Sequence, residues 1–170
     1  KQHGSEGGIT ASRGTAATHM GGMTIHSWTG MGVQSYLSES DIEALVEKPY
    51  LAKRFQKVKV LIIDEVSMLH HFRLDLIDQI LKTAKKSNDP FGGVQLVLCG
   101  DFFQLPPVSR FGEPESHFIY KSESWKDAGY KVNLGGPAFD DPGGEFTPGQ
   151  YIRVGVTINS RRCARTCTFS

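Results

Sequence analysis

The sequence predicts an α/β fold organised around a parallel β-sheet. Two apolar runs, Val60–Ile63 and Val94–Cys99, are rich in β-branched residues, and an acidic residue follows each of them closely. Such runs are typical of strands that a parallel sheet buries on both faces, and the strands are expected over Val58–Ile63 and Val94–Cys99. A segment of helical period lies between the two runs, and strand–helix–strand is the order of a right-handed βαβ crossover.

The residues before the central run predict one short strand and a series of short helices. Ile9–Ser12 is expected to form the strand, and Gly14–His19 a brief helix that ends at a Gly-Gly pair, where a left-handed cap can form. Ser40–Glu43 fits a capping box at the start of the next helix. Pro49 ends that helix and can be the first residue of another.

The chain after Leu69 changes to a helical period. One apolar face of the expected helix comprises Leu74, Ile77, Ile80, Leu81 and Ala84. Asp78 and Lys82, four residues apart, are expected to pair on its outer face. His70 and His71 stand at its start, and because adjacent side chains point in different directions, a capping or surface role is preferred to a metal pair.

Beyond the second run, the sequence predicts a covering layer, one more strand and a boundary. Trp125 is expected on a short helix that packs over a sheet edge, and Tyr130–Leu134 as a further strand. The composition shifts to Gly- and Pro-rich turns at Gly135, so a domain boundary is placed near Leu134. Residues 135–170 are expected to form an irregular or β-like tail, in which Tyr151–Ile158 alternates like a strand.

Composition and charge limit the classes of function. The 170 residues include 19 basic and 18 acidic side chains, a formal net charge of +1, so any contact with nucleic acid must be local. No apolar run approaches the ~20 residues of a membrane span. The cysteine count of three is odd and Cys99 falls in a predicted strand, which favours a reducing compartment over a disulfide framework.

Asp64 and Glu65 are the first candidates for chemistry. They follow a buried run directly, and two carboxylates at such a position are costly unless a cation meets them. Mg²⁺ carrying nucleotide phosphates is the partner that fits, which is the Walker B arrangement. Asp64 would hold the metal and Glu65 would polarise the attacking water. The alternative interpretation is a strand followed by an exposed acidic turn.

A second set of polar side chains follows the second run. In the segment GVQLVLCGDFFQLPPV, Asp101 comes directly after the strand, and Gln104 stands before the stiff Pro106-Pro107. The carboxyl ends of parallel strands share one edge of a sheet, so Asp101 is expected close to Asp64. Gln104 could hydrogen-bond a γ-phosphate or the attacking water without adding charge.

Hydroxyl groups and glycines near the N-terminus form a third set. Ser12, Thr24 and Ser27 offer hydroxyls beside exposed glycine amides, and such groups commonly contact phosphates. Composition alone favours a structural turn region here.

Together these blocks resemble the petite-integration-frequency (Pif) family of superfamily 1 DNA helicases, which is close to the RecD-like helicases. The blocks are ITASRGTAATHMGGMTIHSW, VLIIDEVSML and DPFGGVQLVLCGDFFQLPPV. The resemblance covers roughly Gly8 to Leu134. It implies a P-loop NTPase motor domain of the RecA-like type, incomplete here.

The resemblance implies an ATP-driven, Mg²⁺-dependent motor that moves 5′ to 3′ on single-stranded DNA. The partners would be single-stranded and forked duplex DNA, the protein a monomer, and the roles DNA repair, recombination and telomere maintenance. It also implies an intracellular enzyme without a membrane, cytoplasmic in a bacterium and nuclear or mitochondrial in a eukaryote. By position, the catalytic residues are Glu65 and Gln104, and the nucleotide-binding residues are Asp64 and Asp101, of which Asp64 holds Mg²⁺. The implied DNA contacts are Ser12, Gly14, His26 and Ser27.

Two departures from the family pattern shape the competing hypotheses. No G-x-x-x-x-G-K-[ST] phosphate loop occurs in the sequence, and residues 135–170 do not match the family's continuation. Arg13 and Thr15 also replace the small and apolar residues expected there. The simplest account is a fragment of a helicase gene with a foreign or frameshifted tail. The alternatives are a non-catalytic remnant that binds nucleic acid or a protein partner, and an unrelated P-loop ATPase, against which the GDFFQLPP block argues.

Overall fold

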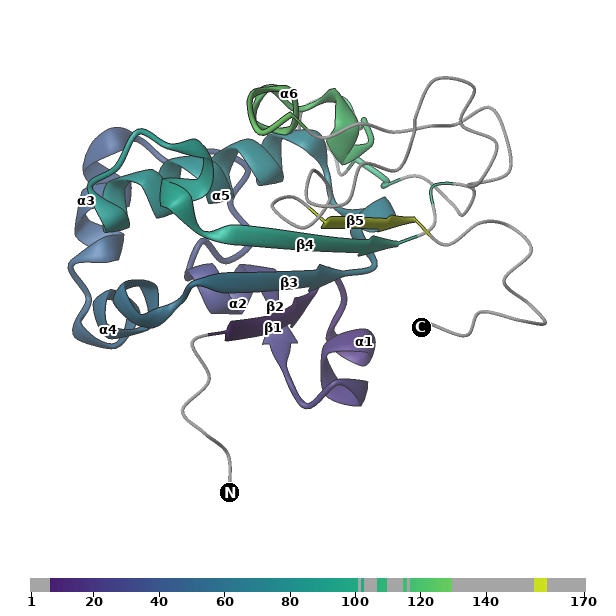
Figure 1. The fold of residues 1–170 in the computed structure, drawn as a ribbon, viewed down its shortest axis with the longest axis horizontal. Helices are drawn as coiled ribbons and strands as arrows, with labels where there is room; N and C mark the ends of the chain where they lie inside the picture. The colour runs from purple at the N-terminus through teal and green to yellow at the C-terminus, as the bar shows by residue number, and fades with distance from the viewer. Residues whose placement is uncertain are drawn as a thin grey trace.

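The computed structural model describes residues 7–100, 102, 107–109, 115, 117–129 and, as backbone only, 155–158. Within these residues one parallel sheet has the strand order β2-β1-β3-β4-β5 (Figure 1). Its strands are β1 (Gly7–Ala11), β2 (Met23–Thr24), β3 (Val60–Asp64), β4 (Gln95–Gly100) and β5 (Gly155–Ile158). The predicted α/β class is therefore confirmed.

The helices connect the strands of this sheet. They are α1 (Gly14–His19), α2 (Ile25–Thr29), α3 (Glu39–Val46), α4 (Pro49–Lys57), α5 (His71–Lys85) and α6 (Glu123–Asp127), with 3₁₀ turns η1 (Val66–Met68), η2 (Pro90–Gly93) and η3 (Ile119–Lys121). The predicted strand–helix–strand unit is confirmed, because β3 and β4 pair in parallel with α5 between them in the chain. In the part of the chain that the structure describes, no helix has the length and apolar character needed to cross a membrane.

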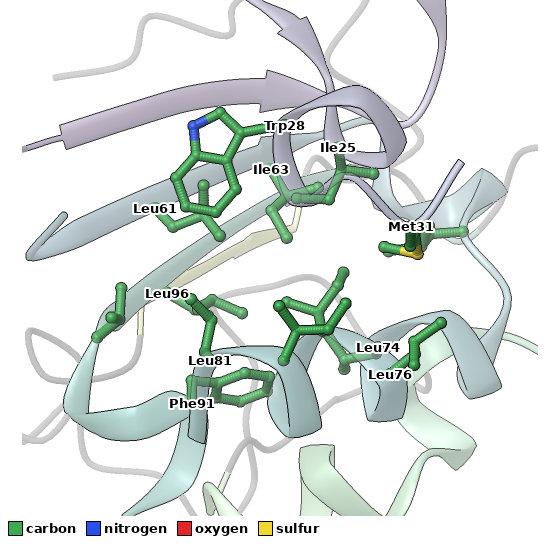
Figure 2. Packing of buried hydrophobic residues seen from close by; sticks show 14 of the residues in the cluster. Ile25, Trp28, Met31, Leu61, Ile63, Leu74, Leu76, Leu81, Phe91 and Leu96 are labelled. Atoms are coloured by element: carbon green, nitrogen blue, oxygen red, sulfur yellow. The ribbon is translucent and has the colours of Figure 1, made fainter. Parts of the chain in front are cut away.

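The hydrophobic core lies on one face of the sheet. Figure 2 shows Leu61 and Ile63 of β3 and Leu96 of β4 facing the same cluster as Leu81 of α5. The side chains between them in β3 and β4 are only half-buried, and Ile9 of β1 is 47% exposed. The prediction that these strands are buried on both faces is therefore wrong, because the helices of this cluster pack against alternate residues of each strand.

The helix α3 begins two residues before the predicted position. Ser38 is its N-cap and accepts a hydrogen bond from the amide of Asp41 at 3.2 Å, while the Asp41 carboxylate accepts one from the Ser38 amide at 3.0 Å. The Ser38 hydroxyl also donates a hydrogen bond of 2.6 Å to the Asp41 carboxylate, and this bond, together with the one from the Ser38 amide, lowers the pKa of Asp41. The capping box therefore uses Ser38 and Asp41 instead of Ser40 and Glu43, whereas Pro49 begins α4 as predicted.

Asp78 and Lys82 form the predicted ion pair, with Nζ 2.7 Å from Oδ2. The predicted outer-face position of Asp78 is wrong, because its side chain is buried and its Oδ1 accepts a hydrogen bond from the Phe91 amide at 2.6 Å. This contact docks η2 onto α5. Gly92 allows the close approach, because a Cβ there would lie 2.5 Å from the carbonyl oxygen of Leu81. The docked turn ends at Gly93, two residues before β4 begins at Gln95.

Aromatic side chains cover the region beyond β4. The ring of Phe102 makes edge contacts with Phe118, Tyr120 and Trp125, and Trp125 is buried. The packing role predicted for Trp125 is therefore confirmed. His70 is the N-cap of α5 but makes no side-chain capping hydrogen bond, and its ring stacks on Phe72.

Beyond α6, the structure describes one further strand of the sheet. The strand predicted at Tyr130–Leu134 lies outside the described residues. Gly155–Ile158, within the predicted alternating segment, forms β5 and pairs in parallel with β4. The domain boundary near Leu134 stays a prediction.

Candidate functional site

The carboxyl ends of β1 and β3 lie side by side and begin the candidate site. Ala11 of β1 is in register with Asp64 of β3, so Ser12 and Glu65 are the first residues beyond the two strands. The Ser12 amide donates a hydrogen bond of 3.0 Å to the carbonyl of Asp64. The Ser12 hydroxyl donates one of 2.7 Å to the carbonyl of Glu65. The two chain segments are thus joined one residue past the end of the regular sheet.

Glu65 has a left-handed backbone, with φ 56° and ψ 40°. For a residue with a Cβ this conformation costs roughly 1–2 kcal/mol, and it persists only where surrounding contacts impose it. Glu65 leads directly into η1, and its carbonyl also accepts the Met68 amide at 3.1 Å. The chain therefore turns sharply at the residue predicted to be the general base.

The end of β4 packs closely against this turn. A Cβ at Gly100 would lie 2.9 Å from the amide nitrogen of Val66 and 3.2 Å from that of Ser67, so a larger residue would push the two segments apart. Asp101 and Gln104 follow Gly100 and lie outside the described residues. The expectation that Asp101 shares an edge with Asp64, and the role of Gln104, stay predictions.

The negative charge of Asp64 acts on the neighbouring thiol of Cys99. Ile63 of β3 pairs with Leu98 of β4, which places Asp64 and Cys99 next in register. Burial raises the pKa of Cys99, and the negative charge of Asp64 raises it further. Cys99 therefore remains a neutral thiol beside the candidate metal ligand.

The donor set at the sheet edge fits a metal ion shared with a phosphate ligand. Asp64 is half-buried and offers one carboxylate, and within the described ranges no group of three His, Cys, Asp or Glu side chains could hold an ion. Mg²⁺ is usually bound by one or two carboxylates together with substrate phosphates and water, not by an all-protein cage. Asp64 is therefore compatible with Mg²⁺ carried by a nucleotide.

The four residues predicted to contact DNA lie just beyond the ends of two adjacent strands. β1 and β2 are parallel neighbours, so Ser12 and Gly14 after β1 lie near His26 and Ser27, which follow β2. Gly14 and Ser27 are exposed, whereas Ser12 and His26 are half-buried. Thr24 caps α2 by accepting the Ser27 amide at 3.2 Å, so this hydroxyl has a structural role.

The sequence did not reveal the hydrogen bond from the Ser12 hydroxyl to the Glu65 carbonyl. The two residues are 53 positions apart, and no local pattern marks them as partners. Only the parallel register of β1 and β3 brings them together.

Comparisons with known proteins agree with this geometry. The sequence model of the PIF1-like helicase family matches residues 2–135. The chain is similar to the ATP-dependent DNA helicase Pif1 of Psychrobacter sp., with 52% identity over 124 residues, which are 72% of this chain and 19% of that protein. It is also 40% identical over 118 residues to human PIF1, covering 69% of this chain and 18% of that protein.

Solved structures show the same likeness. The Pif1 helicase from Candida albicans matches with a TM-score of 0.65 and 40% identity over 71% of this chain and 27% of that chain. A Bacteroides Pif1 in complex with ADP-AlF3 and single-stranded DNA matches with a TM-score of 0.60 and 32% identity over 75% of this chain and 31% of that chain. The chain spans about a fifth of the length of the curated relatives named above. Because the family model matches residues 2–135, which include strands β1 to β4, the DEVSML turn and the aromatic layer beyond β4, the chain belongs to the PIF1-like helicase family.

Proposed function

We propose that this chain provides the Walker B part of the motor domain of an ATP-dependent DNA helicase that moves 5′ to 3′. One observation carries the proposal: Asp64 and Glu65 stand at the carboxyl edge of a parallel sheet, where the Ser12 hydroxyl, just beyond β1, donates a hydrogen bond to the carbonyl of the left-handed Glu65. The family membership supports it, and a relative in the same family binds a nucleotide analogue and single-stranded DNA.

The roles of the residues follow from their chemistry. Asp64 would hold Mg²⁺ together with the nucleotide phosphates, and the bound metal would neutralise charge on them. Glu65 would orient the attacking water and accept its proton. For Asp101 and Gln104, we propose a second carboxylate at the nucleotide site and a contact to the γ-phosphate, both supported by their place in the sequence after β4.

The proposed partners are single-stranded and forked duplex DNA, with Ser12, Gly14, His26 and Ser27 on the DNA-facing side. A related structure describes DNA unwinding at forked duplex DNA by two coordinating Pif1 helicases. We keep a monomer, an intracellular location and the boundary near Leu134 as parts of the proposal. The end of the family match at residue 135 supports that boundary.

A second candidate function is a non-catalytic protein that binds nucleic acid or a protein partner through the same sheet edge. This candidate requires no phosphate loop, and no G-x-x-x-x-G-K-[ST] motif occurs in these 170 residues. The two candidates differ in whether Glu65 can support hydrolysis when a phosphate loop is supplied.

The deciding experiment supplies that loop. The aligned 124-residue segment of the Psychrobacter Pif1 relative is replaced by the matching residues of this chain. DNA-stimulated ATP hydrolysis and unwinding of a forked duplex are then measured. We expect the chimera to keep activity within about tenfold of its parent, and Glu65→Gln to lower it by at least ~10²-fold because a general base is lost. A folded but inactive chimera, beside an active parent, would support the non-catalytic candidate.

A further inference from the structure

We propose that Ser12 is a positioning residue for Glu65, a role that rests on the proposed function of Glu65 as general base. The Ser12 hydroxyl donates to the Glu65 carbonyl at 2.7 Å, and the Ser12 amide donates to the Asp64 carbonyl at 3.0 Å. The single residue that follows β1 thus holds the backbone of both acidic residues of the DE pair.

The left-handed turn explains why a side chain is needed here. Along β1 and β3 the strands are joined by backbone hydrogen bonds up to the Ala11–Asp64 pair. At Glu65 the backbone leaves the extended conformation, with φ 56°, so the next carbonyl is no longer placed for the regular ladder. The Ser12 hydroxyl reaches this carbonyl instead and holds the turn against its intrinsic strain.

A count of hydrogen-bond donors separates this role from a DNA contact. A serine hydroxyl has one donor proton, and the oxygens of a DNA backbone phosphate only accept. While Ser12 donates to Glu65, it cannot also donate to a phosphate. The structure therefore assigns the Ser12 proton to the turn, whereas Gly14 and Ser27 remain exposed for DNA.

Thr10 offers a matched control. Its hydroxyl donates a hydrogen bond of 2.7 Å to the carbonyl of Ile62, which also joins β1 to β3, but at a residue in the regular strand. Thr10→Val removes a bond of the same kind and length without touching the Glu65 turn. Ser12→Thr retains the hydroxyl and is the conservative rescue.

The first test uses the 170-residue chain and does not depend on activity. The Cα and Cβ chemical shifts of Glu65 and its amide–Hα coupling report its backbone conformation by NMR. We expect Ser12→Ala to move these values away from those of a left-handed residue, while Ser12→Thr and Thr10→Val leave them unchanged. Unchanged Glu65 signals in Ser12→Ala, with a loss of melting temperature equal to that of Thr10→Val, would overturn the proposal.

A double-mutant cycle covers the possibility that Ser12→Ala folds poorly. Glycine adopts φ > 0 without strain, so the Glu65→Gly turn needs less external support. We expect Ser12→Ala to lower the melting temperature less in the Glu65→Gly background than in the wild type. Equal losses in both backgrounds would contradict a link between the hydroxyl and the turn.

The second test measures function in the Psychrobacter chimera. We expect Ser12→Ala to lower kcat for DNA-stimulated ATP hydrolysis at least tenfold, with KM for ATP and Kd for oligo-dT each within about twofold, and Ser12→Thr to restore most of kcat. A normal kcat with a Kd for oligo-dT raised fivefold or more would show a DNA contact instead. If Glu65→Gln leaves the chimera active, the proposed role of Glu65 as general base is wrong. The NMR experiment then still tests whether Ser12 holds the backbone of Glu65.

Discussion

Asp64 stands beside Cys99 at the carboxyl ends of β3 and β4, and its negative charge helps to keep the Cys99 thiol protonated. The thiol therefore reports the charge at the candidate metal ligand. Because burial and Asp64 both raise the pKa of Cys99 above its ordinary value of 9.0, its thiolate fraction is small at neutral pH.

Removing this charge should make Cys99 more reactive. In a Cys163→Ser/Cys167→Ser background, Asp64→Asn should lower the pKa of Cys99 and raise its alkylation rate at pH 8, because the thiolate is the nucleophile. Iodoacetamide labelling followed by mass spectrometry across pH 7–10 measures the effect. Asp41→Asn, an exposed carboxylate on α3, is the control and should leave the rate unchanged. Equal rates in the two variants would show that the Asp64 charge does not reach the thiol.

Gly92→Ala should destabilise the protein more than Gly93→Ala. Both glycines have positive φ, so both substitutions strain the backbone by about 1–2 kcal/mol. Only at Gly92 would the added Cβ meet backbone atoms of α5, 2.5 Å from the Leu81 carbonyl oxygen. We expect the free energy of unfolding of Gly92→Ala to be lower than that of Gly93→Ala by roughly 1–3 kcal/mol, as for other overpacked sites. Urea unfolding of the two variants measures this difference. Equal free energies of unfolding for the two variants would mean that η2 can move away from α5 without loss of stability.

Asp78→Ala should cost more than Lys82→Met, although the two side chains form one ion pair. Without Asp78 the buried amide of Phe91 has no hydrogen-bond acceptor, which should lower the free energy of unfolding by about 1–3 kcal/mol. Without Lys82 only a partly exposed ion pair disappears, which is worth up to ~1 kcal/mol. Chemical unfolding of both variants provides the comparison, and a larger effect of Lys82→Met would contradict the docking role of Asp78.

Arg13→Ala should weaken DNA binding in a salt-dependent way. Arg13 is exposed between Ser12 and Gly14, two of the residues proposed to lie on the DNA-facing side. If it neutralises one phosphate, its loss should reduce the slope of log K against log salt by about 0.7 for single-stranded DNA. Fluorescence anisotropy with oligo-dT in the chimera, between 50 and 300 mM salt, measures the slope. Lys53→Ala, an exposed cation on α4, is the control, and equal slopes for both variants would exclude a specific phosphate contact at Arg13.

The 170-residue chain alone should hydrolyse ATP negligibly. Its sequence contains no G-x-x-x-x-G-K-[ST] phosphate loop, whose lysine and backbone amides would hold the β- and γ-phosphates of ATP. Stabilisation of the transition state by several kcal/mol is therefore missing. A coupled assay with and without oligo-dT tests this. Turnover well above background that Glu65→Gln abolishes would refute the expectation.

The periodicity of the sequence was sufficient for the main elements of the fold. Local patterns specify β3, β4 and the helix α5 between them. Runs of β-branched residues form the two strands, and apolar residues at helical spacing form one face of α5. The DE pair after the first run also indicated the candidate site, because carboxylates directly after a buried strand need a partner.

The tertiary structure decided what depends on residues far apart in the chain. The half-buried face of β3 and the burial of Asp78 follow from where helices and the η2 turn pack, which periodicity does not specify. The two-residue strand β2 is too short to give a pattern of its own. The link from Ser12 to Glu65 exists only because β1 and β3 pair in one register, which brings a hydroxyl to a carbonyl 53 residues away and holds a turn that neither segment would form alone.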